Sequence, residues 1–256
     1  MMSQAGVEIP RRRDALAASG RLWKGPRGRH LAEPGFAMTL SCEQTVDYNV
    51  AICHAPAAEV IRRALAEVDD SGSPALIMLA GAALGAARTL SDAGWVPVGT
   101  VPFMSLSISS GGLDGSVRRL DLAGLTVLRS HVEEAFGLPP LGARLAVPDS
   151  AAIDAHDADP AFAGWGLYQD DQMVAGLETV FVNDNVCIWS MATPPGLQHR
   201  GYGRRLLTGV LAQCSIQGAE TCLLIASTPG EPLYLSMGFA VVEYWQVWSR
   251  PRWVLA

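Results

Sequence analysis

The chain has 256 residues, of which 49% are hydrophobic and 17% are charged, and its formal net charge is −6. This composition is too apolar for a disordered chain and can fill the core of one large or two small domains. The acidic balance argues against a general nucleic-acid binder, which is usually basic. Because no apolar run is long enough to cross a bilayer and residues 1–10 lack the apolar core of an export signal, we expect a cytoplasmic protein without a membrane partner.

The five cysteines, Cys42, Cys53, Cys187, Cys214 and Cys222, form an odd and scattered set. We expect buried free thiols in a reducing compartment rather than disulfides. No Cys-x-x-Cys or His-x-x-x-His spacing indicates a metal. The acidic stretch 154–159, which contains His156, is predicted to be a helix end and a solvated loop, because its polar residues are too contiguous to converge on one ion. We therefore expect no metal site.

Apolar periodicity predicts alternating helices and strands through the first part of the chain. The expected elements are a helix over 11–23, strands over 36–42 and 49–54, a helix over 57–68, a buried strand over 75–80, a helix over 82–93 and a long strand over 95–109. Residues 24–29 are expected to form a basic loop, and Gly94 is expected to end the helix before it.

The Gly/Ser-rich segment 110–115 is the predicted boundary between two halves. The second half is expected to contain a strand over 117–122, helices over 125–136 and 148–155, a hairpin of 165–169 with 173–182, a strand over 186–193, a helix after Gly203, a strand over 222–226 and one or two closing strands over 239–249.

The two halves of the chain share a similar sequence pattern. A strand, a helix and then Gly94-Trp95 in the first half match a strand, a helix and then Gly238-Phe239 in the second, with Leu90 at the place of Tyr234. This pattern indicates a weak internal repeat of one α/β unit, and chance similarity between two ordinary αβ stretches is the alternative.

The second half has a compact glycine turn, Gln198-His199-Arg200-Gly201-Tyr202-Gly203, between a predicted strand and a predicted helix. Glycines allow close backbone approach, and the first N–H groups of a helix have no partner within it, so such a turn can bind an anion. The turn lacks the Gly-Lys-Ser/Thr of a Walker loop and the third glycine of a Rossmann fingerprint. A plain tight turn with surface arginines is the alternative.

Together with Thr193-Pro194-Pro195 before it and Tyr234-Leu235-Ser236-Met237-Gly238-Phe239 after it, this turn resembles the acyl-CoA-binding core of the GNAT acetyltransferase superfamily. The likeness is strong over roughly the last third of the chain. It implies an α/β (α+β) fold of two tandem GNAT-like units, each a mixed, mostly antiparallel central sheet flanked by helices. Residues 1–115 would be a degenerate unit without the glycine turn, and residues 116–256 would be the acyl-CoA-binding catalytic unit.

The resemblance also implies acetyl-CoA as the acyl donor. The positions that match the family's cofactor contacts are the backbone groups of Met191 and Thr193 on the strand, the residues of the turn and the helix start (Gln198, His199, Arg200, Gly201, Tyr202, Gly203 and Arg204), and Ser227 after the next strand. The acceptor is expected to be the primary amine of a small molecule or peptide. We expect a monomer, with a dimer as the alternative.

Acyl transfer needs a neutral amine and a proton donor for the leaving thiolate. Tyr234 matches the family tyrosine and is the candidate general acid, because a phenol is protonated at neutral pH. A core tyrosine is the other interpretation. Glu178 lies in an apolar strand and is the candidate base, although a solvent-facing carboxylate or a chain of water molecules would fit the pattern as well.

Two prolines, Pro229 and Pro232, are expected to shorten the helix that carries Tyr234 or to delay its start. We expect most of the three tryptophans Trp165, Trp189 and Trp245 in the core, and the lining of an acceptor pocket is the alternative. A non-catalytic acyl-CoA-binding sensor or regulatory module is the alternative function. It would keep Gly201 and Gly203 and would not depend on Tyr234.

Overall fold

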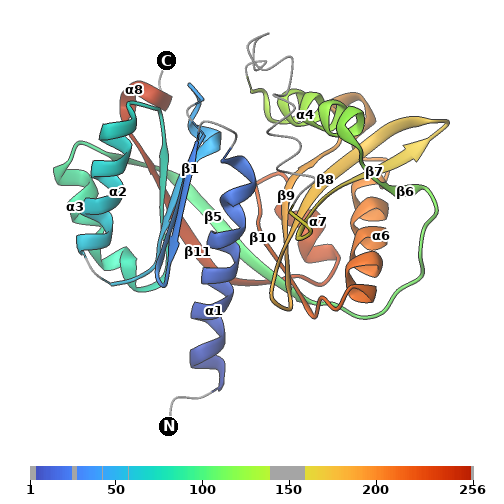
Figure 1. The fold of residues 1–256 in the computed structure, drawn as a ribbon, viewed down its shortest axis with the longest axis horizontal. Helices are drawn as coiled ribbons and strands as arrows, with labels where there is room; N and C mark the ends of the chain where they lie inside the picture. Colours follow the sequence, from blue (N-terminus) through green and yellow to red (C-terminus); the bar gives the residue numbers. More distant parts are fainter. Residues whose placement is uncertain (1–3, 25–27, 42, 57, 139–158, 255–256) are drawn as a thin grey trace. The chain divides into compact units, whose positions relative to one another are not determined.

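The computed structural model describes residues 4–24, 28–41, 43–56, 58–138 and 159–254. The expected helix 148–155, residues 154–158 of the acidic stretch and Cys42 lie outside these residues. The chain forms two compact units (Figure 1). One contains residues 1–104, 225–231 and 240–256, and the other contains residues 105–224 and 232–239. The division expected from the sequence, 1–115 and 116–256, separates the two repeats and not these contact-based units, and it remains a prediction.

The first unit is a mixed sheet with helices. Its elements are α1 (Gln4–Ser19), η1 (Gly20–Trp23), β1 (Arg29–Glu33), β2 (Phe36–Leu40), η2 (Val46–Tyr48), β3 (Asn49–Cys53), α2 (Ala58–Ser71), β4 (Leu76–Leu79), η3 (Gly81–Ala86), α3 (Ala87–Asp92), most of β5 (Val96–Ser107), β11 (Ala240–Ser249) and α8 (Pro251–Val254). The order β1-β2-β3-β4-β11 is antiparallel except for the parallel pair β3–β4.

The second unit repeats this plan. Its elements are β6 (Val117–Arg119), α4 (Leu122–Phe136), β7 (Phe162–Gln169), β8 (Gln172–Val182), β9 (Asn185–Ala192), η4 (Pro195–Leu197), α6 (Tyr202–Ile216), β10 (Thr221–Ile225) and α7 (Glu231–Ser236). Ile225 and Glu231 are counted with the first unit. The order β6-β7-β8-β9-β10 is antiparallel except for the parallel pair β9–β10. The predicted fold class, with mixed and mostly antiparallel sheets flanked by helices, is therefore confirmed.

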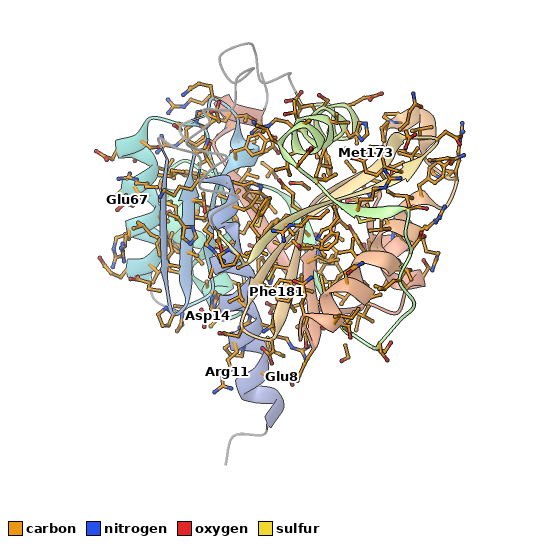
Figure 2. The ribbon with its side chains drawn as sticks, turned by 45° about the vertical axis from the view of Figure 1, so that its right-hand side comes forward. Glu8, Arg11, Asp14, Glu67, Met173 and Phe181 are labelled. Carbon is orange, nitrogen blue, oxygen red and sulfur yellow. The ribbon has the colours of Figure 1, made fainter. Side chains whose placement is uncertain are left out.

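Helix α4 packs closely against the sheet of the second unit because the strands present glycines to it. A Cβ atom at Gly164 would lie 2.4 Å from Leu125 Cδ2, and one at Gly176 would lie 2.7 Å from Leu128 Cδ1. Leu128 and Val132 of α4 join Met173 of β8, labelled in Figure 2, in one apolar cluster. Burial of such side chains stabilises the unit by roughly 1.5–3 kcal/mol for each large one.

The internal repeat predicted from the sequence has matching local geometry in the two units. In each, one helix connects two parallel neighbouring strands, and a short helix follows the second strand. Both short helices end at a glycine of positive φ, 78° at Gly94 and 92° at Gly238. In each unit, the N–H of the residue after this glycine donates to the carbonyl five residues before it. The Trp95 N–H donates to the Leu90 carbonyl at 3.0 Å, and the Phe239 N–H donates to the Tyr234 carbonyl at 3.1 Å. Leu90 and Tyr234 therefore hold equivalent positions in the two repeats.

Several boundaries differ from the sequence predictions. Strand β1 was not predicted, because Arg29, His30 and Glu33 give it a polar, loop-like sequence. Helix α1 begins at Gln4 and runs through Pro10, although a proline interior to a helix is unfavourable. The expected helix 82–93 is divided into η3 and α3, and the closing segment is one strand, β11.

The core predictions agree with the structure. Trp165, Trp189 and Trp245 are all buried, with at most 9% of the residue surface exposed. The cysteines that the structure describes, Cys53, Cys187, Cys214 and Cys222, are buried and take part in no disulfide. None of the described helices has the length and apolarity needed to cross a membrane. In the same ranges of the chain, no group of three His, Cys, Asp or Glu residues is arranged to hold a metal ion.

Candidate functional site

The candidate site begins where β9 parts from β10 in the second unit. One extra residue interrupts its pairing with β8, since Gly176 pairs with Ala192 but Glu178 pairs with Trp189. Ser190 takes up this bulge with a φ of 51°, which is uncommon for a residue with a side chain. The register of β9 with β10 runs from Asn185 only to Cys187, although β9 continues to Ala192. The two parallel strands therefore part, as the resemblance implied.

The glycine turn follows β9 and opens α6. His199 and Gly201 have positive φ values of 61° and 80°. The first intrahelical bond of this turn is donated by the Arg205 N–H to the Gly201 carbonyl at 3.0 Å. The N–H groups of Tyr202, Gly203 and Arg204 come before it, so helix geometry leaves them without an intrahelical acceptor. The partial positive charge of the helix start is concentrated at these groups, which makes the turn a site for an anion.

The two glycines of the turn are needed for different reasons. A Cβ atom at Gly201 would meet nothing within 4 Å, so its positive φ is what favours glycine there. A Cβ atom at Gly203 would lie 3.2 Å from Met191 Cε and 3.3 Å from Leu233 Cδ2. Gly203 therefore lets the start of α6 approach both β9 and α7 closely.

The loop before the helix is held by its own polar groups. Gln198 Nε2 donates to the Thr193 carbonyl at 3.0 Å, and an Arg200 guanidinium N–H donates to the Gly196 carbonyl at 3.1 Å. The Tyr202 hydroxyl donates to Gln169 Oε1 at 2.5 Å. These contacts fix the conformation of the turn and leave its main-chain N–H groups as the anion-binding element.

Two of the three arginines near the turn are engaged elsewhere in the unit. Arg204 donates to Ser236 Oγ at 2.6 Å and to the Ser236 carbonyl at 3.3 Å. Arg205 forms a bidentate pair with Asp114, at 2.6 and 3.2 Å. The hydrogen bond from Arg205 lowers the pKa of Asp114 to about 2. The positive potential of the turn therefore comes chiefly from the helix start and less from a free arginine cluster than the sequence indicated.

Tyr234 is carried by α7, which is only six residues long and has Pro232 in its first turn, as the prolines predicted. The residue is 8% exposed, and its ring meets Phe239 edge to face at a centroid distance of 5.5 Å. Its hydroxyl donates to Met191 Sδ at 3.4 Å. Burial raises the pKa of Tyr234, with a smaller effect from Cys222, so the phenol is protonated well above neutral pH.

The other predicted residues lie in several places. Glu178 is half-buried on β8, beside the bulge and paired with Trp189. Ser227 belongs to the segment 225–231 of the first unit, where its carbonyl accepts the N–H groups of Gly230 and Glu231. Met191, Thr193, Gly203 and Tyr234 converge in the second unit. Sequence reasoning did not find Ser190 or Asp114, because neither has a local motif and the partner of Asp114 is far along the chain.

The equivalent region of the first unit is closed. β3 and β4 stay paired to Cys53 and Leu79, and the Ala80 N–H then donates to the Cys53 carbonyl at 2.9 Å. The Arg13 guanidinium of α1 lies against Gly81, where its carbon would be 2.5 Å from an added Cβ. Asp14, labelled on α1 in Figure 2, accepts the Gly35 N–H at 3.0 Å. In the first unit, therefore, the strands stay paired at the position where β9 and β10 part in the second unit, and the Arg13 side chain lies against Gly81.

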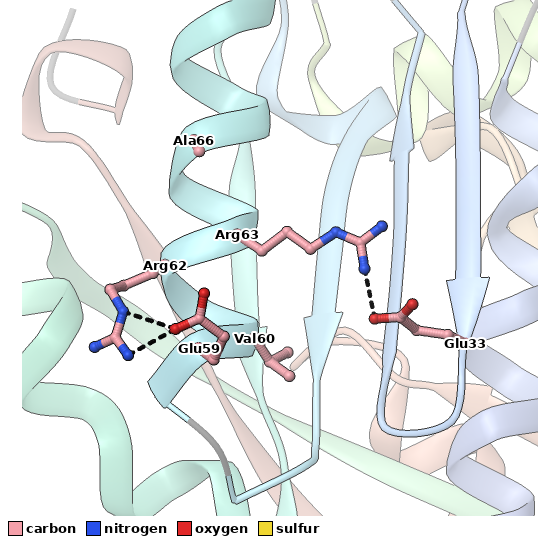
Figure 3. Close-up of a pocket in the computed structure, with 6 residues that line it drawn as sticks. All are labelled: Glu33, Glu59, Val60, Arg62, Arg63 and Ala66. Carbon is pink, nitrogen blue, oxygen red and sulfur yellow. Dashed lines mark hydrogen bonds and ion pairs between the residues drawn. The ribbon is translucent and has the colours of Figure 1, made fainter.

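A hollow of about 480 Å³ on the first unit is lined by Glu33, Glu59, Val60, Arg62, Arg63 and Ala66 (Figure 3). Its charged groups satisfy one another, since Arg63 pairs with Glu33 at 2.6 Å and Arg62 pairs with Glu59 at 2.8 Å. All four side chains are substantially exposed. The hollow therefore offers no convergent, desolvated groups and is not the candidate site.

Comparison with known proteins agrees with this geometry. The family described as "Acetyltransferase (GNAT) domain" matches residues 161–241, and no curated protein matches the chain. Among solved structures, a GCN5-related N-acetyltransferase from Kribbella flavida is 14% identical, with a TM-score of 0.64 and coverage of 98% of this chain and 97% of that one. A GCN5-related N-acetyltransferase from Sphaerobacter thermophilus is 14% identical, with a TM-score of 0.57 and coverage of 86% and 77%.

A putative acetyltransferase from Novosphingobium aromaticivorans is likewise 14% identical, with a TM-score of 0.55, and covers 93% of this chain and 98% of that one. At this identity the three structures establish the fold, which extends over both units, while the family match is confined to the part that holds the parted strands and the glycine turn. Residues 161–241 therefore match the acetyltransferase (GNAT) domain family, and the chain has the fold of these GNAT proteins.

Proposed function

We propose that the protein is an N-acetyltransferase that transfers an acetyl group from acetyl-CoA to the primary amine of a small molecule or peptide. The observation that carries this proposal is the geometry of β9 and α6 in the second unit. Two parallel strands part, the freed strand leads into a turn of positive φ, and unpaired helix N–H groups follow. A pyrophosphate fits such a helix start, and the main chain of Met191 and Thr193 fits an extended amide-containing arm.

The proposed reaction is a direct attack. The neutral amine nitrogen bonds to the thioester carbonyl carbon, and the carbon–sulfur bond breaks. The leaving thiolate takes the hydroxyl proton of Tyr234, and the proton lost by the amine passes to Glu178 or to water and finally restores the phenol. Tyr234 suits its part because burial keeps the phenol protonated. The family match supports an acyltransferase, and the roles of these residues are our proposal.

The first unit is proposed to be a degenerate repeat that does not bind acetyl-CoA. Leu90 stands at the position of Tyr234, and Arg13 fills the region next to Gly81. Only one equivalent of acetyl-CoA should therefore bind. A monomer acting in the cytoplasm remains part of the proposal.

A panel of primary amines tests the activity. Purified protein is mixed with acetyl-CoA and, in turn, a polyamine, an aminoglycoside, amino acids and a peptide, and thiol release is followed with a thiol-reactive dye. The expected result is release that depends on one class of amine, with the acetylated amine detected by mass spectrometry. Tight acetyl-CoA binding without transfer to any amine would instead favour a non-catalytic acyl-CoA-binding module.

Replacing Glu178 with glutamine tests the base. If Glu178 accepts the amine proton, kcat should fall by about 10²-fold near neutral pH, and the loss should shrink as pH rises and the free amine becomes abundant. The affinity for acetyl-CoA should stay the same, because Glu178 is not placed among its proposed contacts. A constant loss at every pH, or none, would assign the proton transfer to water and leave Glu178 as a strand residue.

A further inference from the structure

The side chain of Met191 connects the helix start with the proposed acid. Its sulfur accepts the Tyr234 hydroxyl at 3.4 Å, and its methyl group faces Gly203, where an added Cβ would lie 3.2 Å away. The adjacent Ser190, with its φ of 51°, forms the bulge that precedes this residue. The resemblance implied a contact between acetyl-CoA and the main chain of Met191 only. It implied no role for the Met191 side chain.

In this contact the Tyr234 hydroxyl is the donor and the Met191 sulfur is a weak acceptor. A phenol has a single proton to donate, and a thioether sulfur accepts hydrogen bonds weakly. A buried tyrosine hydroxyl nevertheless stabilises the fold when it has a partner, and Tyr234 is 8% exposed. Methionine is also flexible, with three rotatable bonds in its side chain, so the contact can be broken without moving the main chain.

We propose that Met191 is a positioning residue whose sulfur holds the Tyr234 hydroxyl until the sulfur of CoA replaces it as the acceptor. The inference rests on the proposed function. The hydroxyl is held beside Met191, between β9 and α7, and the two sulfurs compete for one proton. When product CoA leaves, the thioether takes the hydroxyl again, so Met191 weakens the hold on the product and assists its release.

The competition is measurable as a preference for a ligand with a sulfur atom. Calorimetry gives the Kd of CoA and of desulfo-CoA, in which hydrogen replaces the terminal thiol, for the wild type, Met191→Leu, Tyr234→Phe and the double variant. Leucine keeps the volume and removes the competing acceptor. The ratio of the two Kd values should therefore change about twofold in favour of CoA in Met191→Leu, the effect of a hydrogen bond at the weak end of the usual range. In the Tyr234→Phe background the same substitution should have no effect.

Met173→Leu is the matched control, because Met173 lies in the same unit with its sulfur against Gly166 and Gly176. It should leave the ratio unchanged. An unchanged ratio in Met191→Leu, or an equal change with and without the Tyr234 hydroxyl, would overturn the inference. If the folded wild type binds neither ligand, the proposed function fails and the inference falls with it. If it binds both and Met191→Leu is without effect, only the inference fails.

Discussion

Replacing Tyr234 with phenylalanine is expected to slow acetyl transfer by about 10²-fold or more while the Kd of acetyl-CoA stays within about twofold. Phenylalanine keeps the ring that packs edge to face on Phe239 and removes only the hydroxyl that contacts Met191. The thiolate then leaves without its proton donor. The hydrogen bond to sulfur is weak, so its loss should cost the fold little.

The pH dependence of kcat for the wild type and for Tyr234→Phe is a second test of the acid role. A general acid works in its protonated form, and burial raises the pKa of Tyr234 above the ordinary tyrosine value of about 10. The wild type should therefore lose no activity through ionisation of Tyr234 as pH rises to about 9. Steady-state kinetics at fixed saturating acetyl-CoA measures both effects. Equal kcat values for the wild type and Tyr234→Phe would remove the acid role from Tyr234.

A fragment of residues 116–256 is expected not to fold into a stable domain. Its last strand, β11, pairs with β4 of the first unit through Gln246–Leu79, Val247–Met78 and Trp248–Ile77. Trp245 is fully buried, and Val247 and Trp248 are buried too. Leaving these side chains without their partners costs roughly 1.5–3 kcal/mol for each, which together approaches the 5–15 kcal/mol stability of a typical domain.

Circular dichroism and thermal unfolding of the fragment, compared with the full chain, measure this loss. The matched control is the full chain carrying a protease site at Gly112, in the exposed loop between the halves. After cleavage, this control retains both pieces, so it separates the loss of the first unit from the break in the chain, and we expect it to stay folded. A cooperative unfolding transition of the isolated fragment, near that of the full chain, would show that the second half folds independently.

The sequence predicted those features that depend on local pattern. Apolar spacing located most strands and helices, the prolines predicted a short α7, and alignment of the two halves placed Leu90 opposite Tyr234. The first two signals are carried within about twenty residues by period or by turn chemistry, and the third comes from comparing two such short stretches.

Features that depend on distant partners were not predictable in this way. The sequence around Arg205 does not reveal Asp114 as its partner, because they meet only through the sheet and α6. The bulge at Ser190 has no glycine to mark it, since the register of β8 against β9 imposes it. Membership of β11 in the first unit follows from pairing with β4, which no local pattern records.

The central claim is that the second unit alone binds acetyl-CoA at the glycine turn. The most direct test is calorimetry with acetyl-CoA on the wild type, Gly203→Glu and the control Gly85→Glu. The Gly203 substitution puts bulk and negative charge where an added Cβ already meets Met191 and Leu233, whereas a Cβ at Gly85 meets nothing within 4 Å. We predict one equivalent bound by the wild type and by Gly85→Glu, and none by Gly203→Glu. A folded wild type that binds no acetyl-CoA, or that binds two equivalents, would contradict the claim.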